Sequence, residues 1–255
     1  MKRIGCVAAL VLGTALPLHA GVPFESDDAG TVDVGAVEVE YAGSWLEDRE
    51  AGSAKRSHDG ELSLTTGISK RGDVGVTIPY TFQEKVSEGG TSKGFGDISV
   101  GMKYRFAEMG GLSFAVAPSL TLPTGDTTEG RSEKAWIPGV TLIMTREMGE
   151  SGAIHANAGY SRYFYTDDAV DDSSNNDALF FSLALEGKVT KAFSAGVEAG
   201  TANPLEKGNG TWNSFALVGC SFTVREGFDL NAALRFGLNK GEDDYTILYG
   251  ATVTF

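Results

Sequence analysis

Three stretches of the sequence contain residue types at spacings that known chemical sites use. The run GFGDISVGMKYRF at 94–106 begins with the glycine spacing of a loop that binds a dinucleotide pyrophosphate. The run TDDAVDDSSNND at 166–177 holds five aspartates, and carboxylates are the ligands that Ca²⁺ and Mg²⁺ prefer. His155 and Ser161 together offer the base and the nucleophile of a hydrolase.

The surrounding pattern favours a different interpretation of each stretch. In 94–106, Ser99 replaces the third glycine of the dinucleotide motif, and apolar residues occupy every second position. The aspartate run lacks the turn glycine and terminal glutamate of a calcium loop, which favours a solvated acidic loop. His155 and Ser161 would lie about 20 Å apart on one strand, and His58 falls in a polar stretch expected to be a solvated loop. We therefore expect no cofactor, no metal and no enzyme activity.

The alternation of apolar and polar residues recurs along the chain and predicts an all-β protein. The predicted strands are about ten residues long, which is the length that a tilted strand needs to cross a bilayer. Only the stretch 213–224 is ambiguous in phase, because apolar residues occur on both of its faces. The twelve predicted strands fall at about 37–45, 62–68, 74–82, 98–106, 112–122, 136–144, 154–160, 179–185, 193–199, 213–224, 228–236 and 245–255.

The connections between these strands alternate in length. Every second connection is a turn of a few residues, and the others are longer and polar: 48–59, 85–95, 123–135, 166–177, 202–212 and the shorter 239–244. Transmembrane barrels have this asymmetry, with tight periplasmic turns and longer extracellular loops. Because an unpaired strand edge is costly in hydrocarbon, the first and last strands must pair. Residues 33–255 are therefore predicted to form a closed antiparallel β-barrel of about twelve strands in the bacterial outer membrane, rather than a soluble β-sandwich.

The first residues predict export. Lys2 and Arg3 precede an apolar run that ends before Ala20, as in a signal peptide comprising residues 1–20. Its removal takes the formal net charge from −13 to −15, and this acidic balance argues against nucleic acid as a partner. The following segment, 21–32, lies before the first predicted strand, and the sequence is compatible with a periplasmic or a lumenal position for it.

Three motifs of the chain resemble those of a known family. PFESDDAGT at 23–31, GFGDISVGMKYRF at 94–106 and SLTLPTGD at 119–126 resemble stretches of the MetA-pathway of phenol degradation family of outer-membrane barrels. The resemblance implies passage of hydrophobic or aromatic compounds across the outer membrane, and it carries over no catalytic residues. The final YGATVTF resembles the C-terminal signal that the barrel-assembly machinery reads, with Phe255 at the last position.

The polar faces of the predicted strands should point into the lumen. Charges of both signs there either line a water-filled passage or pair across the lumen and seal it, and the sequence is compatible with both outcomes. The predicted lumen-lining residues are Glu38, Glu40, Glu61, Asp97, Lys103, Arg105, His155, Glu186, Lys188, Glu198 and Arg235.

The expected function is therefore that of a channel or transporter for small molecules. Its expected partners are outer-membrane lipid, lipopolysaccharide, the barrel-assembly machinery and a small-molecule substrate. A non-conducting structural barrel and an outer-membrane lipid-modifying enzyme are the alternatives.

Pro79, Pro118 and Pro138 fall inside predicted strands. Each proline removes one ladder hydrogen bond, and a closed barrel has no free edge where that loss is harmless. We expect these prolines to mark either bulges or a weakened wall through which apolar compounds leave sideways.

Overall fold

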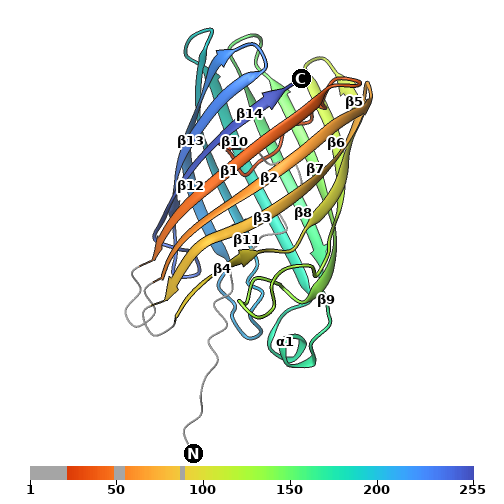
Figure 1. The fold of residues 1–255 in the computed structure, drawn as a ribbon. Coiled ribbons are helices and arrows are strands. Elements are labelled where there is room, and N and C mark those ends of the chain that lie inside the picture. The colour runs from red at the N-terminus through yellow and green to blue at the C-terminus, as the bar shows by residue number, and fades with distance from the viewer. Residues whose placement is uncertain (1–21, 49–54, 87–89) are drawn as a thin grey trace, which may run out of the picture.

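The computed structural model describes residues 22–48, 55–86 and 90–255, so the predicted signal peptide at 1–20 lies outside the described residues. Within the described ranges the chain forms fourteen strands and one short helix (Figure 1). In chain order these are β1 (Val37–Asp48), β2 (Lys55–Ser69), β3 (Gly72–Val86), β4 (Thr91–Phe95), β5 (Ser99–Met109), β6 (Leu112–Thr121), β7 (Ala135–Glu147), β8 (Gly152–Arg162), β9 (Phe164–Tyr165), α1 (Asp168–Ser173), β10 (Asp177–Lys188), β11 (Phe193–Ala202), β12 (Asn213–Arg225), β13 (Phe228–Gly237) and β14 (Tyr245–Thr254).

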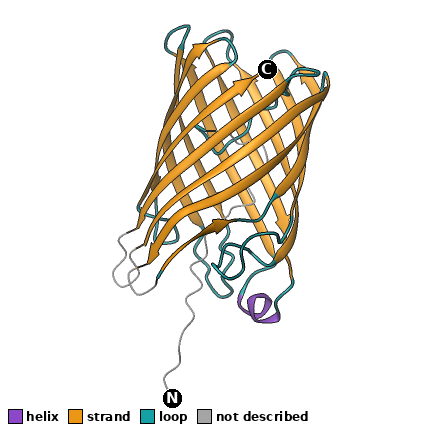
Figure 2. Ribbon diagram, viewed as in Figure 1, coloured by secondary structure: helices purple, strands orange, loops and turns teal. Residues whose placement is uncertain are grey.

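Twelve of these strands close into one antiparallel barrel (Figure 2). Each long strand pairs with its neighbours along the chain, while the short β4 and β9 extend the wall beside β3 and β7. The ring closes between β1 and β14, in a register that runs from Glu38 opposite Thr254 to Glu47 opposite Tyr245. The predicted closed antiparallel barrel of twelve strands is therefore confirmed.

Burial along the strands is the reverse of that in a water-soluble protein. In β10, Leu183 is 57% exposed, whereas its neighbours Ser182 and Ala184 are 7% and 0% exposed. The same pattern holds in β2, where Leu62 and Leu64 point outward. Apolar side chains thus cover the outside and polar or small ones face the lumen, which is the arrangement that a lipid surround requires.

The two ends of the barrel differ as the connection lengths predicted. Tight turns and the C-terminus lie at one end, and the long loops with α1 lie at the other (Figure 1). However, β2 begins at Lys55 and β3 continues to Val86, so strand replaces much of the predicted loops 48–59 and 85–95. Polar residues in these extensions pair as strands beyond the apolar band. No helix in the described ranges is long and apolar enough to cross a bilayer.

Each in-strand proline coincides with an interruption of the hydrogen-bond ladder. Pairing of β3 changes from β5 to β4 between Thr77 and Tyr80, on either side of Pro79. The β5–β6 ladder skips the level of Pro118, and β7 changes partner from β8 to β9 next to Pro138. Because proline has no amide hydrogen, it cannot complete the ladder at these levels. A register shift, the sign of a bulge, lies near Pro79 but not in the β6–β7 ladder that holds Pro118 and Pro138.

The lipid-facing position of Leu183 can be tested with a charge. We expect Leu183→Arg, in the middle of β10, to lower the free energy of unfolding in lipid vesicles by about 2–4 kcal/mol, because an arginine near the bilayer midplane is poorly solvated. Leu238→Arg is the matched control, since Leu238 is 61% exposed but lies in the loop between β13 and β14. Equal effects of the two substitutions in denaturant titrations would contradict a lipid surround for β10.

Candidate functional site: the lumen and its inner belt

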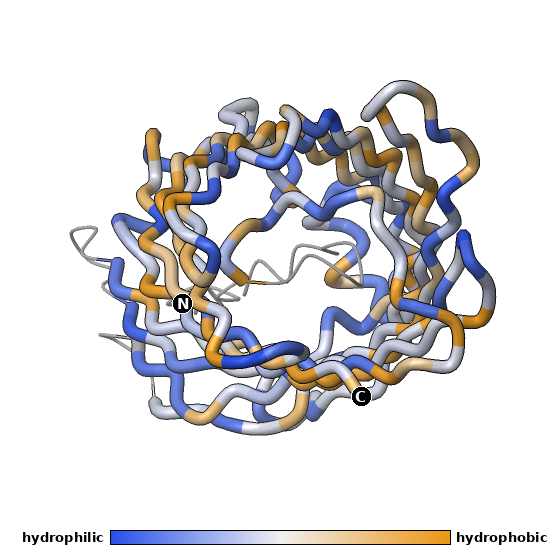
Figure 3. Tube along the Cα trace, turned by 90° about the horizontal axis from the view of Figure 1, so that it is seen from above, coloured by the Kyte–Doolittle hydropathy of each residue, from blue (hydrophilic) through white to orange (hydrophobic). Residues whose placement is uncertain are grey.

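The barrel encloses a cavity of about 1080 Å³. Its walls are the inward side chains of the strands, its boundary toward the long-loop end is formed by loop residues such as Arg131 and Glu133, and residues 22–32 also line it. Figure 3, a view along the barrel, shows chain inside the ring of strands. The cavity is therefore shaped by the wall, by an internal segment and by the loops.

The segment 22–34, which we call the inner belt, runs around the inside of the wall before it continues into β1. Of the two positions that the sequence leaves open for 21–32, the structure places its described part in the lumen. Amides of the belt donate hydrogen bonds to wall side chains in the order of the strands around the ring: Val22 to Glu40 on β1 (3.2 Å), Glu25 to Glu198 on β11 (2.7 Å), Asp27 to Asn157 on β8 (2.8 Å), Ala29 to Thr145 on β7 (2.9 Å) and Val32 to Asp73 on β3 (3.0 Å).

Two ion pairs fix the belt to the wall. The Lys103 ammonium lies 2.9 Å from an Asp27 carboxylate oxygen, and both side chains are almost fully buried. The Arg235 guanidinium lies 2.5 Å from Glu25 and 2.7 Å from Glu242, a residue of the last long loop. Because Asp27 and Glu25 each face a basic side chain of the wall, these two charges of the belt are accommodated within the barrel.

Apolar contacts explain why strand β12 had no clear phase in the sequence. Phe24 of the belt packs with Phe215 and Leu217, which point inward from β12, and with Ala184 and Ala233. The inward face of β12 is thus apolar because it contacts the belt rather than water, while Val218 and Phe222 face outward.

Glycine allows the belt to approach the wall closely. A Cβ on Gly219 would lie 2.7 Å from Pro23, and one on Gly67 would lie 2.1 Å from the Asp33 carbonyl oxygen. Real Cβ atoms do not tolerate such distances, so the absence of a side chain is required at both positions.

The loop 122–134 folds over the mouth of the cavity. Asp97 accepts hydrogen bonds from the amides of Gly125 (2.7 Å) and Glu133 (2.8 Å), and Arg131 forms an ion pair with the buried Glu84. Burial and the neighbouring Asp97 carboxylate raise the pKa of Glu133 to about 7. The mouth of the barrel is therefore lined by charged groups held in defined positions.

The structure divides the residues predicted to line the lumen into three groups. Glu198 lies beneath the belt, where it accepts hydrogen bonds from Glu25 and Ser26. Arg105 and Lys188 lie at the short-turn end, where Arg105 bonds to the Lys70 carbonyl and Lys188 is exposed. The remaining eight line the cavity: Glu38, Glu40, Glu61, Asp97, Lys103, His155, Glu186 and Arg235.

Sequence reasoning missed the lumen residues that lie outside the barrel strands or beyond the predicted strand ends. These include Glu25 and Asp27 of the belt, Arg131 and Glu133 of the loop 122–134, and Glu84 in the extended β3. The one available signal was the density of hydrogen-bonding groups in PFESDDAGT, which is unusual for a tail but suited to a segment lying on a polar wall.

The candidate hydrolase residues do not come together. His155 accepts or donates a 3.0 Å hydrogen bond with the Thr145 hydroxyl, and its other ring nitrogen lies 3.9 Å from Glu186. The buried Thr145 hydroxyl also accepts a hydrogen bond from the Ala29 amide of the belt. Thr145 therefore helps to hold the belt against the wall. Ser161 lies six residues beyond His155 along β8, where it pairs with Gly139 of β7 and Ala178 of β10. These contacts place His155 in the hydrogen-bond network that holds the belt.

The prediction that His58 is a solvated loop residue is wrong. His58 belongs to β2, where its ring bonds to the Tyr249 hydroxyl at 2.6 Å and stacks on Phe82 with 4.9 Å between ring centroids. Trp45 lies nearby, at 5.8 Å. The strand extends farther than the apolar alternation indicated, and it carries His58 into this aromatic group.

The acidic loop is ordered around α1 and its carboxylates are dispersed. Asp167 caps α1, and its hydrogen bond to Lys134 lowers the pKa of Asp167. Asp171 bonds to Asn176, and Asp177 forms an ion pair with Arg162. Across the described residues no group of three or more His, Cys, Asp or Glu side chains is placed to hold a metal ion.

A closed barrel with an apolar outer face and a charged, partly filled lumen defines a transmembrane β-barrel of the outer-membrane class. The family described as "Putative MetA-pathway of phenol degradation" matches residues 22–255, and the chain belongs to this family. No match was found among curated proteins.

Solved structures of outer-membrane channels share the fold at low identity. The COG4313 outer membrane channel from Pseudomonas putida F1 is 14% identical, with a TM-score of 0.75 over 89% of this chain and 98% of that one. The KdgM porin is 11% identical, with a TM-score of 0.57 over 86% and 99% of the two chains. The NanC porin is 7% identical, with a TM-score of 0.60 over 84% and 98%.

The buried Lys103–Asp27 pair offers a test of the belt. We expect Lys103→Ala to lower the free energy of unfolding by about 3–5 kcal/mol, because it leaves the Asp27 carboxylate buried without its cation. Single-channel recording should also show a larger or noisier conductance as the belt loosens. Lys188→Ala, at an exposed position on β10, is the control and should change neither measurement. A variant at Lys103 that matches this control would show that the pair does not hold the belt.

Proposed function

We propose that this protein is a channel for small molecules, among them hydrophobic or aromatic compounds, across the outer membrane. The observation that carries the proposal is the cavity of about 1080 Å³ inside a closed barrel whose outer face is apolar. This volume is as large as the pockets that enclose drug-sized ligands. A molecule of the size of a substituted benzene ring fits such a space with room for water.

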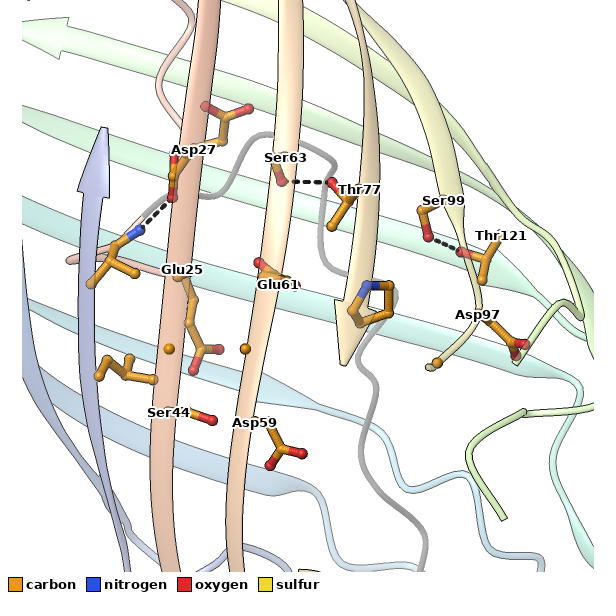
Figure 4. A pocket seen from close by; sticks show the side chains of 18 of the residues that line it. Glu25, Asp27, Ser44, Asp59, Glu61, Ser63, Thr77, Asp97, Ser99 and Thr121 are labelled. Atoms are coloured by element: carbon orange, nitrogen blue, oxygen red, sulfur yellow. Dashed lines mark hydrogen bonds between the residues drawn. The ribbon is translucent and has the colours of Figure 1, made fainter. Parts of the chain in front are cut away.

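The lining suits compounds that combine a ring with a polar group. Phe24, Leu46, Ile137 and Leu248 contribute apolar surface to the cavity, and serine and threonine hydroxyl groups also line it. Ser63 and Thr77 bond to each other at 2.8 Å, and Ser99 and Thr121 do so at 2.7 Å (Figure 4). The phenol degradation in the description of the family supports an aromatic solute with a polar group.

Two alternatives predict different behaviour. In a sealed structural barrel, the belt and the paired charges would block the lumen, and no current would flow. A lipid-modifying enzyme would need a nucleophile and a base in reach of lipid, whereas His155 bonds to the buried Thr145. The similar solved structures named above are channels and porins.

The proposal is tested with purified protein in planar bilayers and in liposomes. We expect discrete conductance steps, and we expect benzyl alcohol to enter protein-containing liposomes faster than protein-free ones. If no current flows at any voltage and the protein does not speed the uptake of benzyl alcohol, the sealed barrel is favoured. If the purified protein modifies lipid and the substitution His155→Ala abolishes that activity, the enzyme is favoured instead.

The interrupted ladder at Pro138 supports a sideways exit for apolar compounds as a further part of this proposal. Pro138 is exposed on the outer face, at the level where β7 changes partner from β8 to β9. Valine would restore an amide donor and favour continuous strand. We expect Pro138→Val to slow uptake of an apolar solute such as toluene while leaving ionic conductance unchanged. Unaltered toluene uptake would count against an exit at this strand.

A further inference from the structure

Four carboxylates form a ladder along the inner face of β1 and β2. Glu38 and Glu40 are successive inward residues of β1, and both line the cavity. The next two inward levels of β1 are Ala42 and Ser44, which lie opposite Glu61 and Asp59 of β2. Each of the four inward levels therefore carries one carboxylate, and strand geometry places successive levels about 7 Å apart. Figure 4 shows Glu61 and Asp59 on this wall.

Among the described residues, the flanking strands place no positive charge directly opposite the four carboxylates. On β14, Thr254 and Thr252 lie opposite Glu38 and Glu40. On β3, Pro79 and Thr81 lie opposite Glu61 and Asp59. Neutral groups bond to three of the carboxylates: Glu38 accepts from the Thr254 hydroxyl, Glu40 from the Val22 amide and Asp59 from the Thr81 hydroxyl.

The basic residues of the cavity are engaged elsewhere. Among the residues that the structure describes, thirteen Asp or Glu residues line the cavity, against five Lys or Arg residues. All five form ion pairs with carboxylates outside the ladder: Lys55 and Arg131 with Glu84, Lys103 with Asp27, Lys134 with Asp167, and Arg235 with Glu25 and Glu242. Within the described residues none of the four ladder carboxylates forms an ion pair, so no basic side chain compensates the ladder when it is ionised.

We propose that the carboxylate ladder makes the lumen selective for cations, both inorganic ions and small protonated amines, over anions. This inference rests on the proposed channel function and names the charge class of its solutes. Rings of acidic side chains select cations in other pores by attracting them and repelling anions. Here the levels are spaced so that a cation leaving one carboxylate is already within reach of the next.

The experiment measures the reversal potential in a tenfold KCl gradient, in mildly alkaline buffer. We expect the wild-type protein to be permeable to K⁺ over Cl⁻. Glu61→Gln should lower this permeability ratio about four- to ninefold, because one unit charge at about 7 Å in water changes the local concentrations of K⁺ and Cl⁻ about two- to threefold each, in opposite directions. Glu38→Gln combined with Glu61→Gln should lower it further. Glu150→Gln removes the same charge in the exposed turn between β7 and β8, and should leave the ratio unchanged.

Matched organic solutes extend the test to substrates. We expect liposomes that contain the wild-type protein to take up benzylamine faster than benzoate. Glu61→Gln should narrow this difference in uptake rate. Uptake of neutral benzyl alcohol should not change in the variant, and this control shows that the variant is folded and open. Equal uptake of benzylamine and benzoate, a preference for Cl⁻, or an unchanged ratio in Glu61→Gln would each overturn the inference and leave the channel function standing. Absence of current together with absence of benzyl alcohol uptake would overturn the channel function and this inference with it.

Discussion

The pairing of β1 with β14 is the constraint on which the rest of the structure depends. Hydrocarbon offers no hydrogen bonds, so every backbone amide and carbonyl in the wall needs a partner strand. Ten consecutive residues of β1, Glu38 to Glu47, meet that need against β14 and remove the free edge of the sheet. Once the wall is closed, alternate side chains must face either lipid or an enclosed space, and the lumen follows from this geometry.

The enclosed space creates a second problem, because polar side chains there are crowded away from bulk water. The inner belt solves part of it, since its amides donate hydrogen bonds to Glu198, Asn157, Thr145 and other acceptors on the wall. Lys103 and Asp27 neutralise each other in the same way. The carboxylates along β1 and β2 are the exception, and we infer that their uncompensated charge is functional rather than structural.

Sequence periodicity predicted much of the fold because lipid contact imposes a strict rule on each strand. Leu179, Phe181, Leu183 and Leu185 alternate for that reason, and strand β10 lies where they indicated. The rule weakens beyond the apolar band, which is why His58 was wrongly expected in a loop. It also fails for β12, where Phe215 and Leu217 face the belt instead of water.

The sequence by itself determined the class of protein, the number and direction of the strands and the two unlike ends, because each of these depends on local alternation and turn length. It also identified most cavity-lining charges on the strands, such as Glu40 and Glu61. Only the tertiary structure decided that residues 22–34 line the wall from inside and that Lys103 pairs with Asp27, 76 residues away. Such pairings depend on which levels of distant strands share a height in the barrel, and that register is a property of the closed ring rather than of any one segment.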